Sequence, residues 1–103
     1  MYFLILGHDK PGMLKTRQEL RPSHLDYIRQ ENLPVRIVAG APMAEDDGET
    51  MNGTWLVVEA EDRAAAEAFA QGDPYYKAGI FASHEVWTVH SQFQASKFLR
   101  LVD

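Results

Sequence analysis

A chain of 103 residues with 46% hydrophobic and 24% charged residues has the size and composition of a single folded domain. It contains no cysteine, which excludes disulfides, thiolate metal sites and cysteine nucleophiles. The net charge is −5, and only ten Lys and Arg residues are present, so we expect no nucleic-acid partner. The first apolar run is too short for a signal peptide or a membrane span, which predicts a cytoplasmic protein without a membrane partner.

The first third of the chain predicts a strand followed by a helical region. Residues 2–7 form a short apolar run with aromatic and β-branched members, which favours a strand. Residues 13–32 show apolar positions three and four apart, as on one face of a helix. Proline is tolerated in the first turn of a helix but not in its interior. We therefore expect a short turn of helix to about Gln18 and a main helix that starts near Pro22.

The middle of the chain predicts two strands joined by an exposed loop. Pro34 ends the helical region, and residues 35–39 form an apolar segment that predicts a strand closing on residues 40–42. Residues 45–52 are polar and rich in turn formers. The next apolar run, residues 54–60, is the third predicted strand.

The last third predicts a helix, a turn and a final strand. Asp62 is a good N-cap for the alanine-rich segment that follows, and Gly72 closes that helix. A short turn from Asp73 leads to the last strand, residues 84–89. The remaining segment, residues 91–103, is a tail without a clear pattern.

The order βαββαβ predicts an α+β fold of the ferredoxin-like type, a two-layer sandwich with a four-stranded antiparallel sheet and two helices on one face. The first and third predicted strands are apolar at both alternating sets of positions, so the face without helices would expose a large apolar surface. We therefore expect a homodimer in which a second copy covers that face. Residues 1–90 form the predicted domain, and the tail is expected to dock on the partner subunit.

One group of residues is a candidate site for acid–base catalysis. Arg21 and His24 are three residues apart and share a helix face. Histidine can exchange a proton near neutral pH and works best when a carboxylate orients its ring. Asp73 is the candidate carboxylate, with Tyr75 beside it as a wall or hydrogen-bond donor. From the residues alone, the same Asp73 is better explained as the cap of a helical turn that begins with proline, and both interpretations stay open.

Several short motifs occur in a fixed order, and together they resemble the YciI-like (YCII-related) family. They are Arg21-Pro22-Ser23-His24-Leu25, Ala39-Gly40-Ala41-Pro42, Gly53, Asp73-Pro74-Tyr75 and Ala78-Gly79-Ile80-Phe81. The resemblance implies a ferredoxin-like fold, homodimers related to dimeric α/β-barrel proteins, and an active site with a His-Asp pair. By position, this catalytic pair is His24 and Asp73. The expected substrate-binding residues are Arg21, Gly40, Pro42 and Tyr75.

The resemblance also implies a class of reaction, because relatives are associated with cofactor-free chemistry on small organic rings, including dehydrochlorination. We expect a lyase or isomerase of a small molecule, without cofactor or metal. In this hypothesis His24 abstracts a proton while Asp73 fixes its tautomer, and Arg21 holds an anionic group. Backbone N–H groups near Gly40 would meet a developing oxygen anion.

Two alternatives come from other classes of protein. Residues 9–14, with the sequence Asp-Lys-Pro-Gly-Met-Leu, resemble the ligand-binding turn of ACT domains, which are regulatory modules that bind amino acids and share the βαββαβ order. A metal site is the second alternative, because imidazole and carboxylate groups can hold zinc or iron. The spacing of the candidate ligands does not support it; they are His8, His24, His84 and His90, with Asp9 or Asp73.

Overall fold

The computed structural model describes residues 1–94. Most of the predicted tail, and with it the expected docking of residues 91–103 on a partner, lies outside the described residues. The elements are β1 (Tyr2–Asp9), α1 (Leu14–Ile28), β2 (Arg36–Ala44), β3 (Met51–Glu59), α2 (Arg63–Gln71), α3 (Pro74–Lys77) and β4 (Phe81–Val89).

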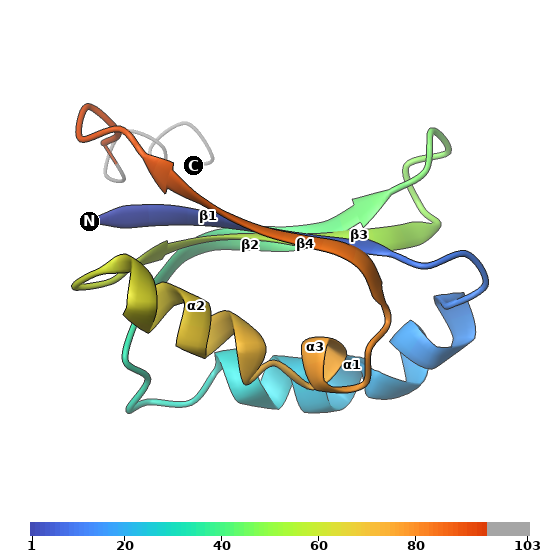
Figure 1. Cartoon of the computed structure of the whole chain (residues 1–103). Coiled ribbons are helices and arrows are strands. Elements are labelled where there is room, and N and C mark those ends of the chain that lie inside the picture. The colour runs from blue at the N-terminus through green and yellow to red at the C-terminus, as the bar shows by residue number, and fades with distance from the viewer. Residues whose placement is uncertain (95–103) are drawn as a thin grey trace.

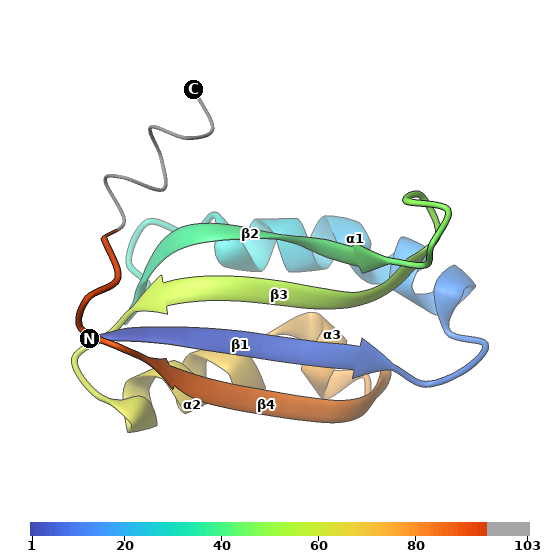
Figure 2. The same ribbon diagram turned by 90° about the horizontal axis from the view of Figure 1, so that it is seen from above.

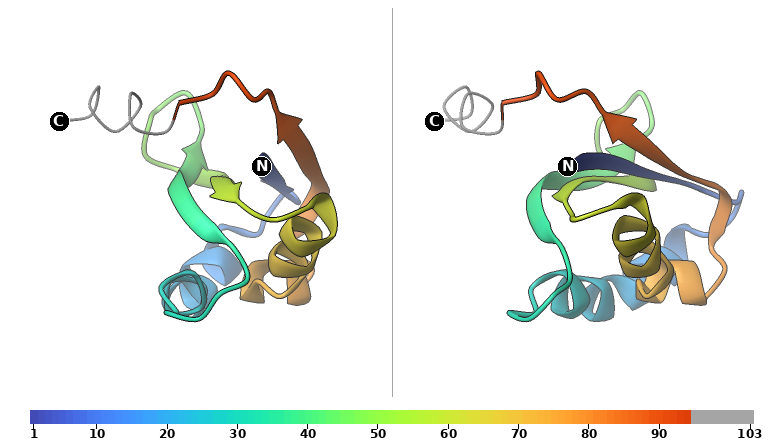
Figure 3. Two further views of the ribbon diagram at one scale, coloured as in Figure 1. Left: turned by 90° about the vertical axis from the view of Figure 1, so that its left-hand side faces the viewer. Right: turned by 60° about the vertical axis from the view of Figure 1, so that its left-hand side comes forward.

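The four strands form one antiparallel sheet in the order β2-β3-β1-β4. All three helices lie on the same face of this sheet, so the molecule has two layers (Figure 1). The view onto the sheet shows the helices behind it, and the end views show them in a single layer (Figures 2 and 3). The prediction of an α+β ferredoxin-like fold is confirmed.

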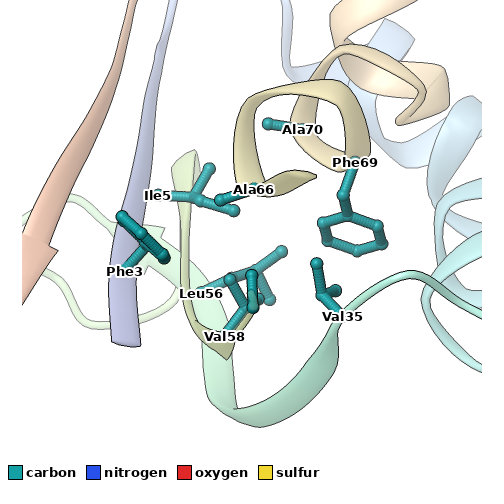
Figure 4. Packing of buried hydrophobic residues seen from close by; sticks show 9 residues of the cluster. Phe3, Ile5, Val35, Leu56, Val58, Ala66, Phe69 and Ala70 are labelled. Atoms are coloured by element: carbon teal, nitrogen blue, oxygen red, sulfur yellow. The ribbon is translucent and has the colours of Figure 1, made fainter. Parts of the chain in front are cut away.

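The hydrophobic core lies between the sheet and α2. Phe3 and Ile5 of β1 and Leu56 and Val58 of β3 point toward the helices and are at most 5% exposed. They pack with small and aromatic side chains of α2, chiefly Ala66, Phe69 and Ala70 (Figure 4). Small residues let α2 approach the sheet closely, and its start is fixed by Asp62, whose side chain accepts the backbone N–H of Ala65 at 2.8 Å.

The first helix is continuous, so the predicted break before Pro22 is wrong. α1 runs from Leu14 to Ile28 with Pro22 inside it, and it ends four residues earlier than expected. Pro22 cannot donate a backbone hydrogen bond to the carbonyl of Gln18. Both residues are exposed, so water can satisfy that carbonyl, and tertiary contacts of the other face hold the helix together.

The second and fourth strands are longer than predicted, and one helix was missed. β2 continues to Ala44, so Gly40 and Pro42 lie inside a strand instead of the loop after it. A proline is tolerated there because β2 is an edge strand with a free side. The turn after Asp73 is a short helix, α3, and β4 begins three residues before position 84.

The sheet face opposite the helices is mostly apolar, with Glu85 of β4 beside Leu6 and accepting a hydrogen bond from Trp87 at 2.7 Å. Leu4 lies between Val57 and Trp87 of the neighbouring strands, and Leu6 pairs with Trp55, which places all five side chains on that face. Trp87 is 56% exposed. Within residues 1–94, no helix covers this face (Figure 2).

The first residues after β4 contact the beginning of the same chain. The ring of Phe93 meets the ring of Tyr2 edge-on, with centroids 5.0 Å apart. The segment after β4 therefore starts along the end of its own sheet.

Candidate active site

The buried face of α1 is polar, which is unusual for a helix that packs on a sheet. Its two buried residues are Arg17, with no exposed surface, and His24, with 5% exposed. Charged and polar side chains are rarely buried unless they are paired, because burial removes their hydration. Each of these two has a specific partner outside α1.

His24 is paired with Asp73, at the start of α3. The Nδ1 atom of His24 lies 2.8 Å from Oδ2 of Asp73, and both side chains are less than a tenth exposed. The other oxygen of Asp73, Oδ1, accepts the backbone N–H of Tyr75 at 2.9 Å. Asp73 therefore caps α3 with one oxygen and contacts the histidine with the other, so the cap does not exclude a contact with His24.

The pairing sets which nitrogen of His24 can act as a base. A carboxylate only accepts hydrogen bonds, so the proton of a neutral imidazole sits on Nδ1 and the lone pair on Nε2. Among the described residues, only Asp73 forms a hydrogen bond with the His24 ring. The arrangement can accept a proton at Nε2 and stabilise the resulting imidazolium through Asp73.

Arg17 is held by Asp9, the last residue of β1. Nε and Nη2 of Arg17 donate to the two carboxylate oxygens of Asp9 at 2.6 and 2.9 Å. The guanidinium carbon lies 4.3 Å from the centroid of the Tyr75 ring, as in a cation–π contact. The carboxylate of Asp9, the first residue of the ACT-like turn, is thus committed to a buried ion pair.

A cavity of about 150 Å³ opens between α1 and the sheet beside His24. Cavities of about this size hold one benzene ring. Its polar lining comes from Arg17, Arg21, His24 and Thr54, and the rest of its lining is apolar: Leu25, Ile28, Ile37, Gly40, Ala41, Pro42 and Leu56. A wider depression at residues 28–37 and 59–61 is shallow, open to solvent and without histidine.

Arg21 is the cation of this cavity that lacks a carboxylate partner within the described chain. It is partly buried, its Nη1 makes a weak hydrogen bond to the sulfur of Met51 at 3.7 Å, and its charge acts on the hydroxyl of Tyr75. Arg17, in contrast, is neutralised by Asp9. A partly buried guanidinium without a counter-ion favours an anionic ligand.

The structure brings most of the predicted site residues together. Arg21, His24, Gly40 and Pro42 border the cavity, and Asp73 lies directly behind His24. Added side-chain atoms at Gly40 would collide with Leu56, so the missing side chain serves close packing within the sheet.

Tyr75 occupies a different place from the other predicted substrate-binding residues. It is completely buried and is not part of the cavity lining. Its ring stacks on His24, with centroids 4.4 Å apart and an angle of 20° between the planes. Burial raises the pKa of its hydroxyl, and the charges of Arg17 and Arg21 oppose this effect.

Sequence reasoning missed Arg17 and Thr54 as cavity residues. Arg17 stands four residues before Arg21 and seven before His24, so the helical spacing could have indicated it. Thr54 carries no such signal, because threonine is an ordinary strand residue. Its hydroxyl is buried without a hydrogen-bond partner in the described structure.

A second histidine faces Asp73 from the sheet. His84 of β4 and Asp73 both border a small cavity of about 10 Å³, close to the volume needed for one water molecule. Partial burial lowers the pKa of His84, and the negative charge of Asp73 works in the opposite direction. Asp73 is therefore near one histidine from α1 and another from β4.

The described residues contain neither a cluster of metal ligands nor a helix that could span a membrane. Within residues 1–94, no three His, Asp or Glu side chains gather to form a metal site. In the same residues, no helix combines the length and apolar character needed to cross a membrane.

The fold is the α+β ferredoxin-like fold, and its structural neighbours are dimeric α/β-barrel proteins. The family model of the YCII-related domain matches residues 1–90, and the chain belongs to this family. Protein YciI of Escherichia coli is 31% identical over 86 residues, covering 79% of this chain and 88% of that protein. An uncharacterized protein of Haemophilus influenzae is 30% identical over 87 residues, covering 80% of this chain and 89% of that protein.

One solved structure links the fold to a reaction. It is the 5-chloro-2-hydroxyhydroquinone dehydrochlorinase TftG of Burkholderia phenoliruptrix, in complex with 2,5-dihydroxybenzoquinone. The two chains superpose with a TM-score of 0.77 at 33% identity, over 87% of this chain and 94% of TftG. This chain is therefore similar to a lyase-type enzyme over nearly its whole length.

Proposed function

We propose that this protein is a cofactor-free lyase of a small hydroxylated ring compound, with His24 as its base and Asp73 as the group that orients and stabilises that base. The observation that carries the proposal is the 2.8 Å contact between Nδ1 of His24 and Asp73 at the wall of a one-ring cavity. The similarity to TftG, a dehydrochlorinase, supports a reaction of this class.

The chemistry of HCl elimination fits these residues. The substrate loses a proton and a chloride ion, so no external oxidant or reductant is required. Nε2 of His24 takes the proton, and Asp73 stabilises the imidazolium. Arg21 binds an oxygen of the substrate that carries negative charge, because its guanidinium has no competing carboxylate in the described chain.

The active form is proposed to be a homodimer. The apolar side chains of the open sheet face, Leu4, Leu6, Trp55, Val57 and Trp87, would be covered by the same face of a second copy. Membership of a superfamily of dimeric proteins supports this arrangement. The cavity lies on the helix side of the sheet, so each subunit would hold its own His24 and Asp73.

The test is release of chloride from 5-chloro-2-hydroxyhydroquinone, measured by ion chromatography under nitrogen with no added cofactor. The unaltered protein is expected to release chloride, and H24Q to lower kcat/KM by about 10²- to 10⁴-fold, the usual contribution of a general base. The matched control is H8Q, because His8 is exposed and outside the cavity. H8Q is expected to keep the unaltered rate.

Binding measured apart from turnover separates this proposal from a regulatory module. Calorimetric titration with 2,5-dihydroxybenzoquinone reports binding whether or not chloride is released. Saturable binding without chloride release would favour a ligand-binding module over a lyase of this substrate. Turnover by H24Q at the unaltered rate would remove His24 from the mechanism.

A further inference from the structure

Tyr75 contacts two of the polar side chains that α1 contributes to the cavity, although it does not reach the cavity itself. The guanidinium carbon of Arg17 is 4.3 Å from the centre of the Tyr75 ring, and the His24 ring is stacked on it at 4.4 Å. Arg17 and His24 are seven residues apart, or about 10 Å along a helix axis. Both side chains nevertheless lie within 4.4 Å of the centre of one ring, so Tyr75 links them.

The far end of this stack is fixed by Asp9. Both carboxylate oxygens of Asp9 bind Arg17, and the two side chains are 5% and 1% exposed. A bidentate pair fixes the plane of the guanidinium as well as its position. The order of contacts is therefore Asp9, Arg17, Tyr75 and His24, and it links the end of β1 to the candidate base.

The near end of the stack returns to Asp73. This residue caps α3 through the N–H of Tyr75 and holds Nδ1 of His24 with its other oxygen. The same carboxylate thus places the tyrosine ring and the imidazole that lies on it. A single hydrogen bond does not by itself fix the rotation of the imidazole about its Cβ–Cγ bond, and a flat ring against its face restricts that rotation.

We propose that Tyr75 and Arg17 are positioning residues for His24: their stack fixes the plane of the imidazole so that Nδ1 stays on Asp73 and Nε2 faces the cavity. This inference rests on the proposed function, in which Nε2 is the base. It assigns Tyr75 a place behind the base instead of a contact with the substrate. Asp9 balances the charge of Arg17, so the stack acts through its geometry.

Three variants separate the effect of the stacked ring from the effects of the Arg17 charge and the Tyr75 hydroxyl. Y75L removes the flat ring, and R17K keeps the positive charge but loses the planar, bidentate guanidinium. Y75F is the matched control, because it keeps the ring and removes a hydroxyl that is buried without a hydrogen-bond partner in the described structure.

We expect Y75L and R17K to lower kcat for chloride release by about 10- to 100-fold, the effect of misplacing a catalytic group by about 1 Å. KM should change less than kcat, because both variants keep the Arg21 side chain; for R17K, which changes a residue of the cavity lining, the split between kcat and KM is read against Y75L. Y75F, which keeps the ring, is expected to have a kcat near that of the unaltered protein. Circular dichroism melting establishes that each variant is folded, and R17K serves as the second test if Y75L does not fold.

Nuclear magnetic resonance can test the positioning role without any substrate, because nitrogen chemical shifts report the tautomer of the His24 ring. The ring nitrogens of neutral His24 should show one tautomer, with the proton on Nδ1, in the unaltered protein and in Y75F. Y75L or R17K should show nitrogen shifts averaged over the two tautomers.

A folded Y75L with unaltered kcat and a single tautomer would overturn the positioning role while leaving the lyase proposal intact. If H24Q is instead as active as the unaltered protein, the lyase proposal fails, and the tautomer measurement still decides the role of the stack.

Discussion

Asp73 binds His24 with one carboxylate oxygen and its own helical turn with the other, at 2.8 and 2.9 Å. The cap and the histidine contact thus use different atoms of one side chain. Because α3 is only four residues long, this cap has a large share in fixing where the carboxylate stands. The geometry of the candidate base depends on a local feature of the chain, the Asp-Pro turn, and on the packing of α3 against α1.

Substitutions at Asp73 should separate its two contacts. D73N keeps an oxygen that can accept the N–H of Tyr75, but it removes the negative charge opposite His24. We expect kcat for chloride release to fall by about 10²- to 10⁴-fold, with little change in the urea midpoint. D73A also removes the cap and should lower the free energy of unfolding by about a further 1 kcal/mol. Equal activity of D73N and the unaltered protein would contradict an orienting role.

The buried pair of Arg17 and Asp9 should contribute strongly to stability as long as both partners are present. R17M leaves the Asp9 carboxylate buried and unpaired, which we expect to lower the free energy of unfolding by about 3–5 kcal/mol in urea titrations. The double variant D9L/R17M removes both charges and should recover much of this loss. The control is R36M, which breaks the exposed pair with Glu59 and should leave the urea midpoint unchanged. A small effect of R17M would show that water reaches the pair.

The fold could be predicted from the sequence because its signals are local. A short apolar run with aromatic and β-branched members, such as Phe3 and Ile5, indicates a strand, and Asp62 before an alanine-rich run indicates a helix start. The break at Pro22 was predicted from the same kind of rule, and it was wrong because contacts with the rest of the molecule override the cost of one lost hydrogen bond at an exposed position.

The site was less accessible to sequence reasoning because its contacts join distant segments. His24 and Asp73 were found through motifs, whereas Arg17 was missed because a helical arginine is usually a solvated residue. Only the packed structure shows that Arg17 meets Asp9 and that Tyr75 lies behind the histidine. No pattern in the chain could indicate that the hydroxyl of Thr54 is buried beside the cavity.

His84 should titrate below the ordinary histidine pKa of about 6.5. Partial burial disfavours its charged form, and this outweighs the attraction of Asp73. Because the folded-state pKa is lower than the unfolded one, the unfolded chain binds more protons between the two values, so this residue's contribution to stability is lost as the pH falls through that window. Proton chemical shifts of the ring measured against pH give the pKa directly. In D73N the pKa of His84 should fall further, and a rise would contradict the assigned effect of Asp73.

The open sheet face should associate two copies of the chain through Trp87 and its neighbours. Sedimentation velocity at micromolar concentration is expected to give the mass of a dimer for the unaltered protein and of a monomer for W87E, because a charge would be buried in an apolar contact. Trp87 is 56% exposed in the single chain, so the substitution should leave the fold of each subunit intact. The control is A64E, which places the same charge at an exposed position of α2 on the opposite side of the molecule and should stay dimeric. An unaltered protein that sediments as a monomer would contradict the proposed assembly, whereas a monomeric W87E that still releases chloride would show that each subunit holds a complete site.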